Sequence, residues 1–447
     1  MSSPSKPSYD DLPALPPLVG DAPGAHNAHD VTPGDIAVGV VIGRASEYFD
    51  FFVYGIASVL VFPALFFPSL PRLDGTLYSF LIFSFAFIAR PLGTLLSMAV
   101  QRRWGRGTKL TIALFLLGTA TVCIAFLPGY ETAGRLSIVL LALLRIAQGI
   151  ALGGTWDGLP SLLALNAPKG RRGWYAMLGQ LGAPLGFVVA SGLFAYLYAS
   201  LQYEEFLAWG WRYAFFVAFA INVVALFARL RLVVAPEYEQ LLDKGELLPT
   251  SVVDLVKAHG ANPWIGAFAA LASYALFHMV TVFPLSWIQL YSDQSITQFL
   301  IVQIVGGVLA AIGIVASGWI ADRVGRRRTL GSLAVLIAVF SGFAPTLLAG
   351  GKLGQDVFIL VGFALLGLSY GQSSGTVTSN FSAKYRYTGA AVTSDFAWLI
   401  GAAFAPLVAL GLSAKFGLGY VSVYLLSGAA CTLAALKINQ AIEARHA

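Results

Sequence analysis

The sequence is poor in charged residues, in cysteine and in histidine. Charged residues make up 11% of its 447 residues, whereas a soluble domain carries about 25%, which excludes an ordinary soluble protein. The two cysteines, Cys123 and Cys431, lie in apolar runs far apart in the chain, which excludes a disulfide framework. Cysteine and histidine do not cluster with the spacing of a metal site. We therefore expect neither a metal nor another cofactor.

Apolar residues, by contrast, are abundant: they form 57% of the chain, and the mean hydropathy is +0.75. Because about 20 apolar residues cross a bilayer as one helix, these runs predict an all-α membrane protein with twelve transmembrane helices. We expect the helices at residues 36–63, 75–100, 110–127, 137–158, 173–198, 211–230, 264–290, 295–321, 330–348, 357–380, 388–412 and 419–438.

The longest polar gap, residues 231–262, separates six predicted helices from the other six. We interpret it as a cytoplasmic linker between two bundles, residues 33–230 and residues 263–447. Residues 1–32 are rich in Ser, Pro, Ala and Asp and predict a disordered cytoplasmic tail without a cleaved signal peptide.

The distribution of lysine and arginine predicts the orientation of the chain. With both termini inside, 20 of the 28 basic residues fall on the cytoplasmic side, Lys109, Arg229 and Arg386 among them, and five on the outer side. This bias is typical of a multi-pass protein of a bacterial-type cytoplasmic membrane. The net charge of +6 belongs to these loops and forms no basic stripe, so nucleic acid is not an expected partner.

A dense group of charges interrupts the apolar pattern at residues 318–330, which read G-W-I-A-D-R-V-G-R-R-R-T-L. This spacing resembles the loop signature of the major facilitator superfamily of transporters. Asp322 can accept hydrogen bonds from the N-terminal amides of a neighbouring helix and from Arg326. We expect such a latch to hold the cytoplasmic ends together in one of two states, and we assign it to Gly318, Asp322, Arg323, Gly325, Arg326 and Arg327. The alternative is that these charges only set the topology.

A weaker copy of this loop lies 220 residues earlier, where Gly105, Arg106 and Leu110 match the second loop. Arg102 stands there in place of the aspartate, so we expect the first half to lack the latch. Two halves of equal orientation are parallel repeats, which place a substrate site between them near the membrane midplane.

The first predicted helix carries three charges, Arg44, Glu47 and Asp50, followed by Tyr54. Its pattern G-x-x-x-E-Y-F-D-F-x-x-Y-G resembles the metabolite:H⁺ symporter family, in which E-W-Y-D-F is usual. Because intramembrane carboxylates are functional by default, Glu47 or Asp50 is a candidate for proton coupling or substrate binding. The alternative is that Arg44 and Glu47 only neutralise each other.

Two further helices match the same family and also depart from it. Residues 145–158 carry Arg145 and Gln148, and the arginine is associated with proton coupling across the superfamily. The usual glutamate is replaced by Thr155. Asp157, two residues later, is either a candidate for proton coupling or a cap of the helix end. In the eleventh helix Asp395 occupies the usual asparagine position and is either a structural partner or a protonatable site.

Arg90 precedes a proline in the second helix. We expect it to pair with Glu47 or Asp50 inside its own bundle, or else to bind a substrate carboxylate. The remaining candidates for the substrate site are polar or aromatic residues of the later helices: Tyr274, His278, Gln289, Tyr370, Gln372 and Asn380. His278 has a second interpretation as a packing residue.

These features predict a secondary transporter, and not an enzyme, that works by alternating access as a monomer. Three buried arginines beside acidic groups favour proton-coupled symport of a small organic anion such as a carboxylate. A zwitterion of the proline/betaine type, export by the same fold, and a receptor-like sensor are the alternatives.

Overall fold

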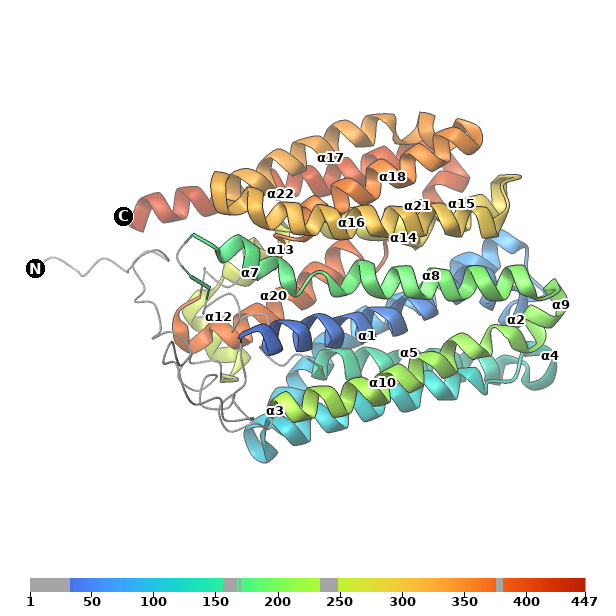
Figure 1. Ribbon diagram of the computed structural model, residues 1–447, viewed down its shortest axis with the longest axis horizontal. Helices are drawn as coiled ribbons and strands as arrows, with labels where there is room; N and C mark the ends of the chain where they lie inside the picture. The colour runs from blue at the N-terminus through green and yellow to red at the C-terminus, as the bar shows by residue number, and fades with distance from the viewer. Residues whose placement is uncertain (1–32, 156–166, 169, 234–247, 375–380, 447) are drawn as a thin grey trace, which may run out of the picture.

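The computed structural model describes residues 33–155, 167–168, 170–233, 248–374 and 381–446 (Figure 1). Within these ranges every regular element is a helix, which confirms the all-α prediction. The predicted tail, Asp157 and Asn380 lie outside the described residues. The exact boundaries of the two bundles and of the linker stay predictions.

In its described residues the first half is built from four long single helices and one helix pair. They are α1 (Pro33–Leu60), α3 (Arg72–Ala125), α5 (Arg135–Gly154), the pair α7 (Arg172–Leu178) and α8 (Gly182–Ser200), and α10 (Arg212–Val233). Short helical elements lie in the connections between them: α2 (Phe62–Phe66), α4 (Tyr130–Ala133), α9 (Tyr203–Glu205) and the turn η1 (Phe206–Gly210).

The second half repeats this plan. The short α12 (Val252–His259) precedes a broken helix formed by α13 (Asn262–Ala269), α14 (Leu271–Thr281) and α15 (Phe283–Tyr291). Next come α16 (Ile296–Val324), α17 (Arg326–Ala349) and α18 (Gly351–Tyr370), and then the turn η2 (Ala383–Tyr385). The chain ends with α20 (Arg386–Gly401), α21 (Ala405–Phe416) and α22 (Gly419–His446).

Twelve membrane spans follow from these elements. Ten helical segments of the described chain are long and apolar enough to cross a bilayer. One of them, α3, has 54 residues, about 80 Å at about 1.5 Å per residue, against a hydrocarbon core of about 30 Å. It turns back at Gly105, whose φ of 83° breaks the helix, and so makes two spans. The remaining span is α1, which carries three charges, Arg44, Glu47 and Asp50, near its centre.

The broken helix α13–α15 shows how irregular backbone is tolerated inside a membrane protein. Pro284 has no N–H group, so it cannot bond the carbonyl of Val280 four residues earlier. The side-chain amide of Gln303, from α16, donates to the carbonyls of Val280 and Thr281 at 3.0 and 2.9 Å. The freed carbonyl is thereby satisfied by a neighbouring helix.

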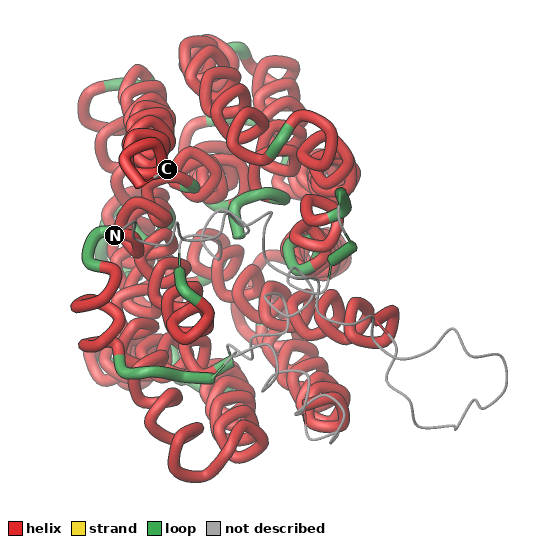
Figure 2. The backbone as a smooth tube through the Cα atoms, turned by 90° about the vertical axis from the view of Figure 1, so that its left-hand side faces the viewer, coloured by secondary structure: helices red, strands yellow, loops and turns green. Residues whose placement is uncertain are grey.

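The two halves lie one above the other in Figure 1, with α1, α3, α5, α8 and α10 below and α14 to α18, α21 and α22 above. The helices α8 and α16 pack together across the boundary. There a Cβ on Gly307 would lie 2.7 Å from Val188. The start of α1 and the end of α22 lie at the same end of the molecule, which we call the terminal end; Figure 2 looks onto it.

Candidate functional site

A cavity lies where the two halves meet; its empty volume of about 480 Å³ includes space open to solvent. Helices α1, α3 and α5 of the first half and α20 of the second half contribute its walls. Its lining combines three charged side chains with aromatic and aliphatic ones: Arg44, Glu47, Tyr48, Phe51, Ala86, Phe87, Arg90, Leu152 and Trp398. A ligand here would touch both halves at once.

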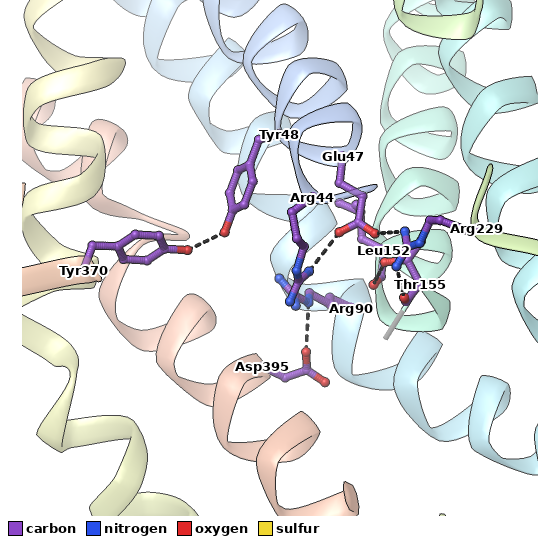
Figure 3. A network of polar contacts seen from close by, with 9 residues as sticks. All are labelled: Arg44, Glu47, Tyr48, Arg90, Leu152, Thr155, Arg229, Tyr370 and Asp395. Atoms are coloured by element: carbon purple, nitrogen blue, oxygen red, sulfur yellow. Dashed lines mark hydrogen bonds and ion pairs between the residues drawn. The ribbon is translucent and has the colours of Figure 1, made fainter. Parts of the chain in front are cut away.

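Glu47 stands at the centre of the first polar group (Figure 3). Arg44 Nη1 lies 2.9 Å from Glu47 Oε2, and Arg229 of α10 pairs with the other carboxylate oxygen. Arg229 also donates to the backbone carbonyl of Thr155 at 3.0 Å. Glu47 is 4% exposed, so both of its oxygens are satisfied by guanidinium groups within the protein.

The burial of Arg229 corrects the expectation that it belongs to the cytoplasmic loop charges. Its exposed fraction is only 4%, because the carboxylate of Glu47 offsets the cost of removing its charge from water. Gly43 makes room for it: a Cβ at that position would come within 3.0 Å of the Arg229 side chain. Sequence reasoning missed this residue because it lies beside other arginines at a helix end.

Arg90 and Asp395 form the second polar group, and it joins the two halves (Figure 3). The Nε atom of Arg90, on α3, lies 2.9 Å from Oδ1 of Asp395, on α20. The hydroxyl of Thr94 donates to the other carboxylate oxygen at 2.6 Å. We had expected Arg90 to pair inside its own bundle; it pairs across the boundary because α3 packs against α20 and Asp395 faces it there.

Aromatic residues from both halves surround these charges. Trp398 stacks on Phe87 with ring centroids 5.8 Å apart and an interplanar angle of 21°. Tyr274 meets Trp398 edge-on at 5.0 Å. The hydroxyl groups of Tyr48 and Tyr370 form a hydrogen bond between α1 and α18. Tyr370 and Tyr274, both predicted site residues, therefore lie next to the cavity wall.

Asp50 belongs to a separate buried cluster inside the first half. Its carboxylate accepts hydrogen bonds from Thr121 at 2.6 Å, Asn222 at 2.5 Å and Gln148 at 3.2 Å. Gln148 in turn accepts from Arg145 at 3.1 Å. The side-chain amide of Gln148 therefore links two other predicted residues, Asp50 and Arg145, in a cluster away from the cavity lining.

Arg145 is held mainly by aromatic faces and by the backbone. Its guanidinium lies 3.9 Å from the ring centroid of Tyr54 and 4.8 Å from that of Phe83, and its Nε donates to the carbonyl of Phe83 at 3.2 Å. Thr121 and Asn222 were missed from the sequence, since an isolated neutral polar residue in an apolar run gives no distinct signal.

Three other predicted residues lie away from the cavity lining. His278 is fully buried among phenylalanine rings, 5.5 Å from Phe51 and 5.3 Å from Phe83, as expected of a packing residue. Gln289 lies on α15, outside the cavity lining. The amide of Gln372 donates to the carbonyl of Gly173 at 3.2 Å and belongs to the contacts of the terminal end.

At the terminal end, Asp322 of α16 contacts the start of α7. Its two carboxylate oxygens accept from the backbone N–H groups of Gly173 at 2.6 Å and Trp174 at 3.1 Å. Arg326 donates to the carbonyl of Arg172 at 3.5 Å. The loop pattern predicted the contact of Asp322 with the first amides of a neighbouring helix. This hydrogen bond of Arg326 goes to the backbone of that helix and not to Asp322.

The other members of the predicted latch have distinct positions. Gly325, with φ of 92°, makes the turn between α16 and α17. Gly318 lies against α7, and Arg323 stacks over the ring of Trp319 at 3.6 Å. Arg327 follows on the first turn of α17. Whether the group acts as a latch stays a prediction.

The first half also contacts its partner at this end, although it lacks the aspartate. The buried hydroxyl of Tyr387, on α20, accepts from Lys109 at 3.1 Å and donates to Gln101 at 3.0 Å. This contact is of another kind than the aspartate latch, because it is made by neutral groups and a lysine of α3. That the first half lacks the aspartate latch stays a prediction.

Comparison with known proteins settles the family. Residues 40–406 match the family model of the Major Facilitator Superfamily, which covers most of the chain. The chain belongs to the major facilitator superfamily. It is therefore a multi-pass membrane transporter, as the loop pattern and the twelve spans predicted.

Curated members of the superfamily resemble this transporter along nearly its whole length. It is 35% identical to the inner membrane metabolite transport protein YhjE of Escherichia coli (strain K12), covering 92% of this chain and 94% of that protein. It is 31% identical to the shikimate transporter of the same organism, covering 90% and 92% of the two chains. These relatives bear out the resemblance to metabolite transporters of this superfamily.

The fold has a solved counterpart as well. A crystal structure of the D-xylose-proton symporter matches with a TM-score of 0.69 at 19% identity, covering 90% of this chain and 96% of that one. At this identity the match concerns the fold. It supports two six-helix bundles for this transporter.

Proposed function

We propose that this transporter carries a small organic anion together with a proton, using the cavity between its halves as the substrate site. The observation that carries the proposal is the Arg90–Asp395 ion pair, which joins one half to the other and whose arginine lines this cavity. A charge pair in this position can respond to both a substrate anion and a proton. The shikimate transporter, a relative, is named for a substrate of this class.

Two arginines in the cavity wall favour an anion. Arg44 and Arg90 both line the cavity, and a guanidinium binds a carboxylate through two parallel N–H donors. Because the wall is otherwise mostly apolar, these interactions gain strength from the low local dielectric. A carboxylate is therefore the functional group that the cavity suits best.

Two carboxylates of the cavity region are candidates for the coupled proton. Asp395 holds one arginine, whereas Glu47 is shared between Arg44 and Arg229. A carboxylate between two cations is the harder one to protonate. Asp395 is thus the better candidate, and the Asp50 cluster has a structural role in the first half.

Alternating access requires the contacts between the halves to separate at one end at a time. We assign the terminal end to the cytoplasm of a bacterial-type inner membrane, with both chain termini inside. Asp322 against α7 and Tyr387 against α3 would then close the cytoplasmic side. Breaking both contacts would open the cavity inward.

A zwitterion of the proline/betaine type is the second candidate, and the aromatic wall favours it. Tyr48, Phe51, Phe87 and Trp398 line the cavity, and such rings attract quaternary ammonium groups. A compatible solute would place its ammonium on these rings and its carboxylate on an arginine.

Uptake into proteoliposomes tests the proposal. We expect radiolabelled shikimate to accumulate when the interior is more alkaline than the medium, and a protonophore to abolish the accumulation. Glycine betaine serves as competitor: strong inhibition by it would favour the zwitterion. Flux of shikimate that does not depend on the pH gradient would rule out symport.

A further inference from the structure

We propose that the terminal nitrogens of Arg90 bind the carboxylate of a ring-bearing monocarboxylate, and that Asp395 takes up the coupled proton when this carboxylate arrives. The inference rests on the proposed function and adds to it the substrate class and the way in which substrate binding drives proton uptake at Asp395.

Arg90 uses one edge of its guanidinium and keeps the other available. Its Nε atom faces Asp395 at 2.9 Å, and no described residue accepts a hydrogen bond from its two terminal nitrogens. The side chain is 13% exposed, and this exposure is toward the cavity that it lines. Because a guanidinium is planar with five N–H donors, its terminal edge can bind a second carboxylate bidentately.

Two carboxylates on one guanidinium repel each other. Inside a protein the repulsion between like charges a few ångströms apart is much stronger than in water, so one of the two groups is driven to bind a proton. When the ligand carboxylate keeps both of its oxygens on Arg90, Asp395 is the group that accepts the proton. The proton joins the Asp395 carboxylate, and the anion plus proton add no net charge to the cavity.

The groups around Asp395 are consistent with this assignment. Arg90 and Thr94 of α3 contact it directly. Further charged or titratable side chains near the cavity come from the helices packed around it: Arg44, Glu47 and Tyr48 of α1, Arg229 of α10, Tyr274 and His278 of α14, and Tyr370 of α18. Glu47 is the other carboxylate of this set, and it is already paired with two arginines.

Protonation would also act on the connection between the halves. The ion pair joins α3 to α20, and a neutral Asp395 no longer forms a charge pair with Arg90. Loading with substrate and proton would therefore loosen this contact and allow the halves to move. An empty, deprotonated transporter would keep the contact.

The remaining wall selects the body of the substrate. Phe87 and Trp398 stack with each other beside Arg90, and Phe51, Ala86 and Leu152 complete an apolar surface. A flat ring suits such a surface, whereas a second carboxylate would meet these apolar groups, the anion Glu47, or Arg44, which is already paired with Glu47. We therefore assign a monocarboxylate with a planar or cyclic body.

Binding measured by calorimetry tests the inference with benzoate as the probe, benzamide as its neutral analogue and isophthalate as its dicarboxylate analogue. We expect benzoate to bind the purified protein with uptake of about one proton, which is obtained from two buffers of different ionisation enthalpy. Benzamide and isophthalate should bind at least tenfold more weakly. Equal or tighter binding of isophthalate would overturn the substrate class.

The variant D395N tests the proton site. It should bind benzoate within a few-fold of the wild-type affinity, take up no proton, and retain counterflow while losing accumulation driven by a pH gradient. If D395N still takes up one proton, Asp395 is not the site, although symport itself survives. If wild-type protein accumulates no organic anion, the proposed function is wrong as well.

The variant T94V gives an independent measurement that does not remove the carboxylate. Thr94 donates to Asp395 at 2.6 Å, a bond that stabilises the charged form. Without it Asp395 holds its proton more readily, so benzoate binding should persist to higher pH than in the wild type. An unchanged pH profile of binding would contradict the assignment.

Discussion

Gly173 and Gly318 meet where α7 crosses α16, and neither position has room for a side chain. A Cβ on Gly173 would lie 2.8 Å from the carbonyl oxygen of Gly318, and a Cβ on Gly318 would lie 2.9 Å from Met177 and 3.0 Å from the Cα atom of Trp174. Two helices from different halves thus approach backbone to backbone, as small residues allow in membrane proteins. This approach brings Asp322 within reach of the amides of α7.

The substitution G318A should therefore weaken the closed terminal end. The added methyl group forces the two helices apart, with a cost of about 1–3 kcal/mol for overpacking. Spin labels at Arg103 of one half and Arg328 of the other, in a background without Cys123 and Cys431, would report a larger fraction of long distances. G342A is the matched control, because a Cβ there meets no atom within 4 Å; an equal response of both variants would contradict the prediction.

The substitution D322N should shift the same distance distribution toward separated ends. An asparagine keeps the shape, but it loses the charge, and its NH₂ group would face one of the two backbone N–H donors. Hydrogen bonds to a charged group are worth about 1.5–3 kcal/mol each, so the effect should exceed that of most surface changes. D254N, at an exposed position of α12, should leave the distribution as it is.

The substitution Y387F tests whether the first half has a working counterpart of this contact. Removal of the hydroxyl takes away the bonds with Gln101 and Lys109 but keeps the ring. We expect the terminal end to open more often, and the double variant with D322N to open more than either single variant. A Y387F protein with the wild-type distance distribution would show that this contact is only local.

The arginines on either side of Glu47 should differ in their contribution to stability. Arg229 has a side-chain exposure of 4% and Arg44 one of 19%. Breaking a buried ion pair from one side costs about 3–5 kcal/mol, so R229M should lower the unfolding temperature clearly more than R44M. Differential scanning fluorimetry in detergent measures both; the reverse order would show that Arg44 is the principal partner of Glu47.

Much of the fold could be predicted because it depends on local chemistry. Runs of apolar residues must form helices in a bilayer, since no water satisfies their backbone groups. The turn at Gly325 and the carboxylate at Asp322 likewise follow from a short pattern, and the structure places the carboxylate on a neighbouring helix start. The predicted residues Arg44, Glu47 and Arg90 all line the cavity.

The partners of these charges could not be predicted in the same way. Arg90 was expected to pair within its half and instead meets Asp395, 305 positions later in the chain. Arg229 was counted with the loops and is buried on Glu47. Each pairing depends on which helix faces overlap, and helical periodicity gives the faces of one helix only.

The sequence by itself determined the class of the protein, its spans, its family and the short list of intramembrane charges, because composition and local patterns limit what a chain can do in a membrane. Only the tertiary structure divided that list into a cavity lined by Arg90, the partner of Asp395, a separate cluster around Asp50, and contacts between the halves at the terminal end. The physical reason is that a buried charge must find a partner, and which partner lies within reach is set by the packing of distant helices.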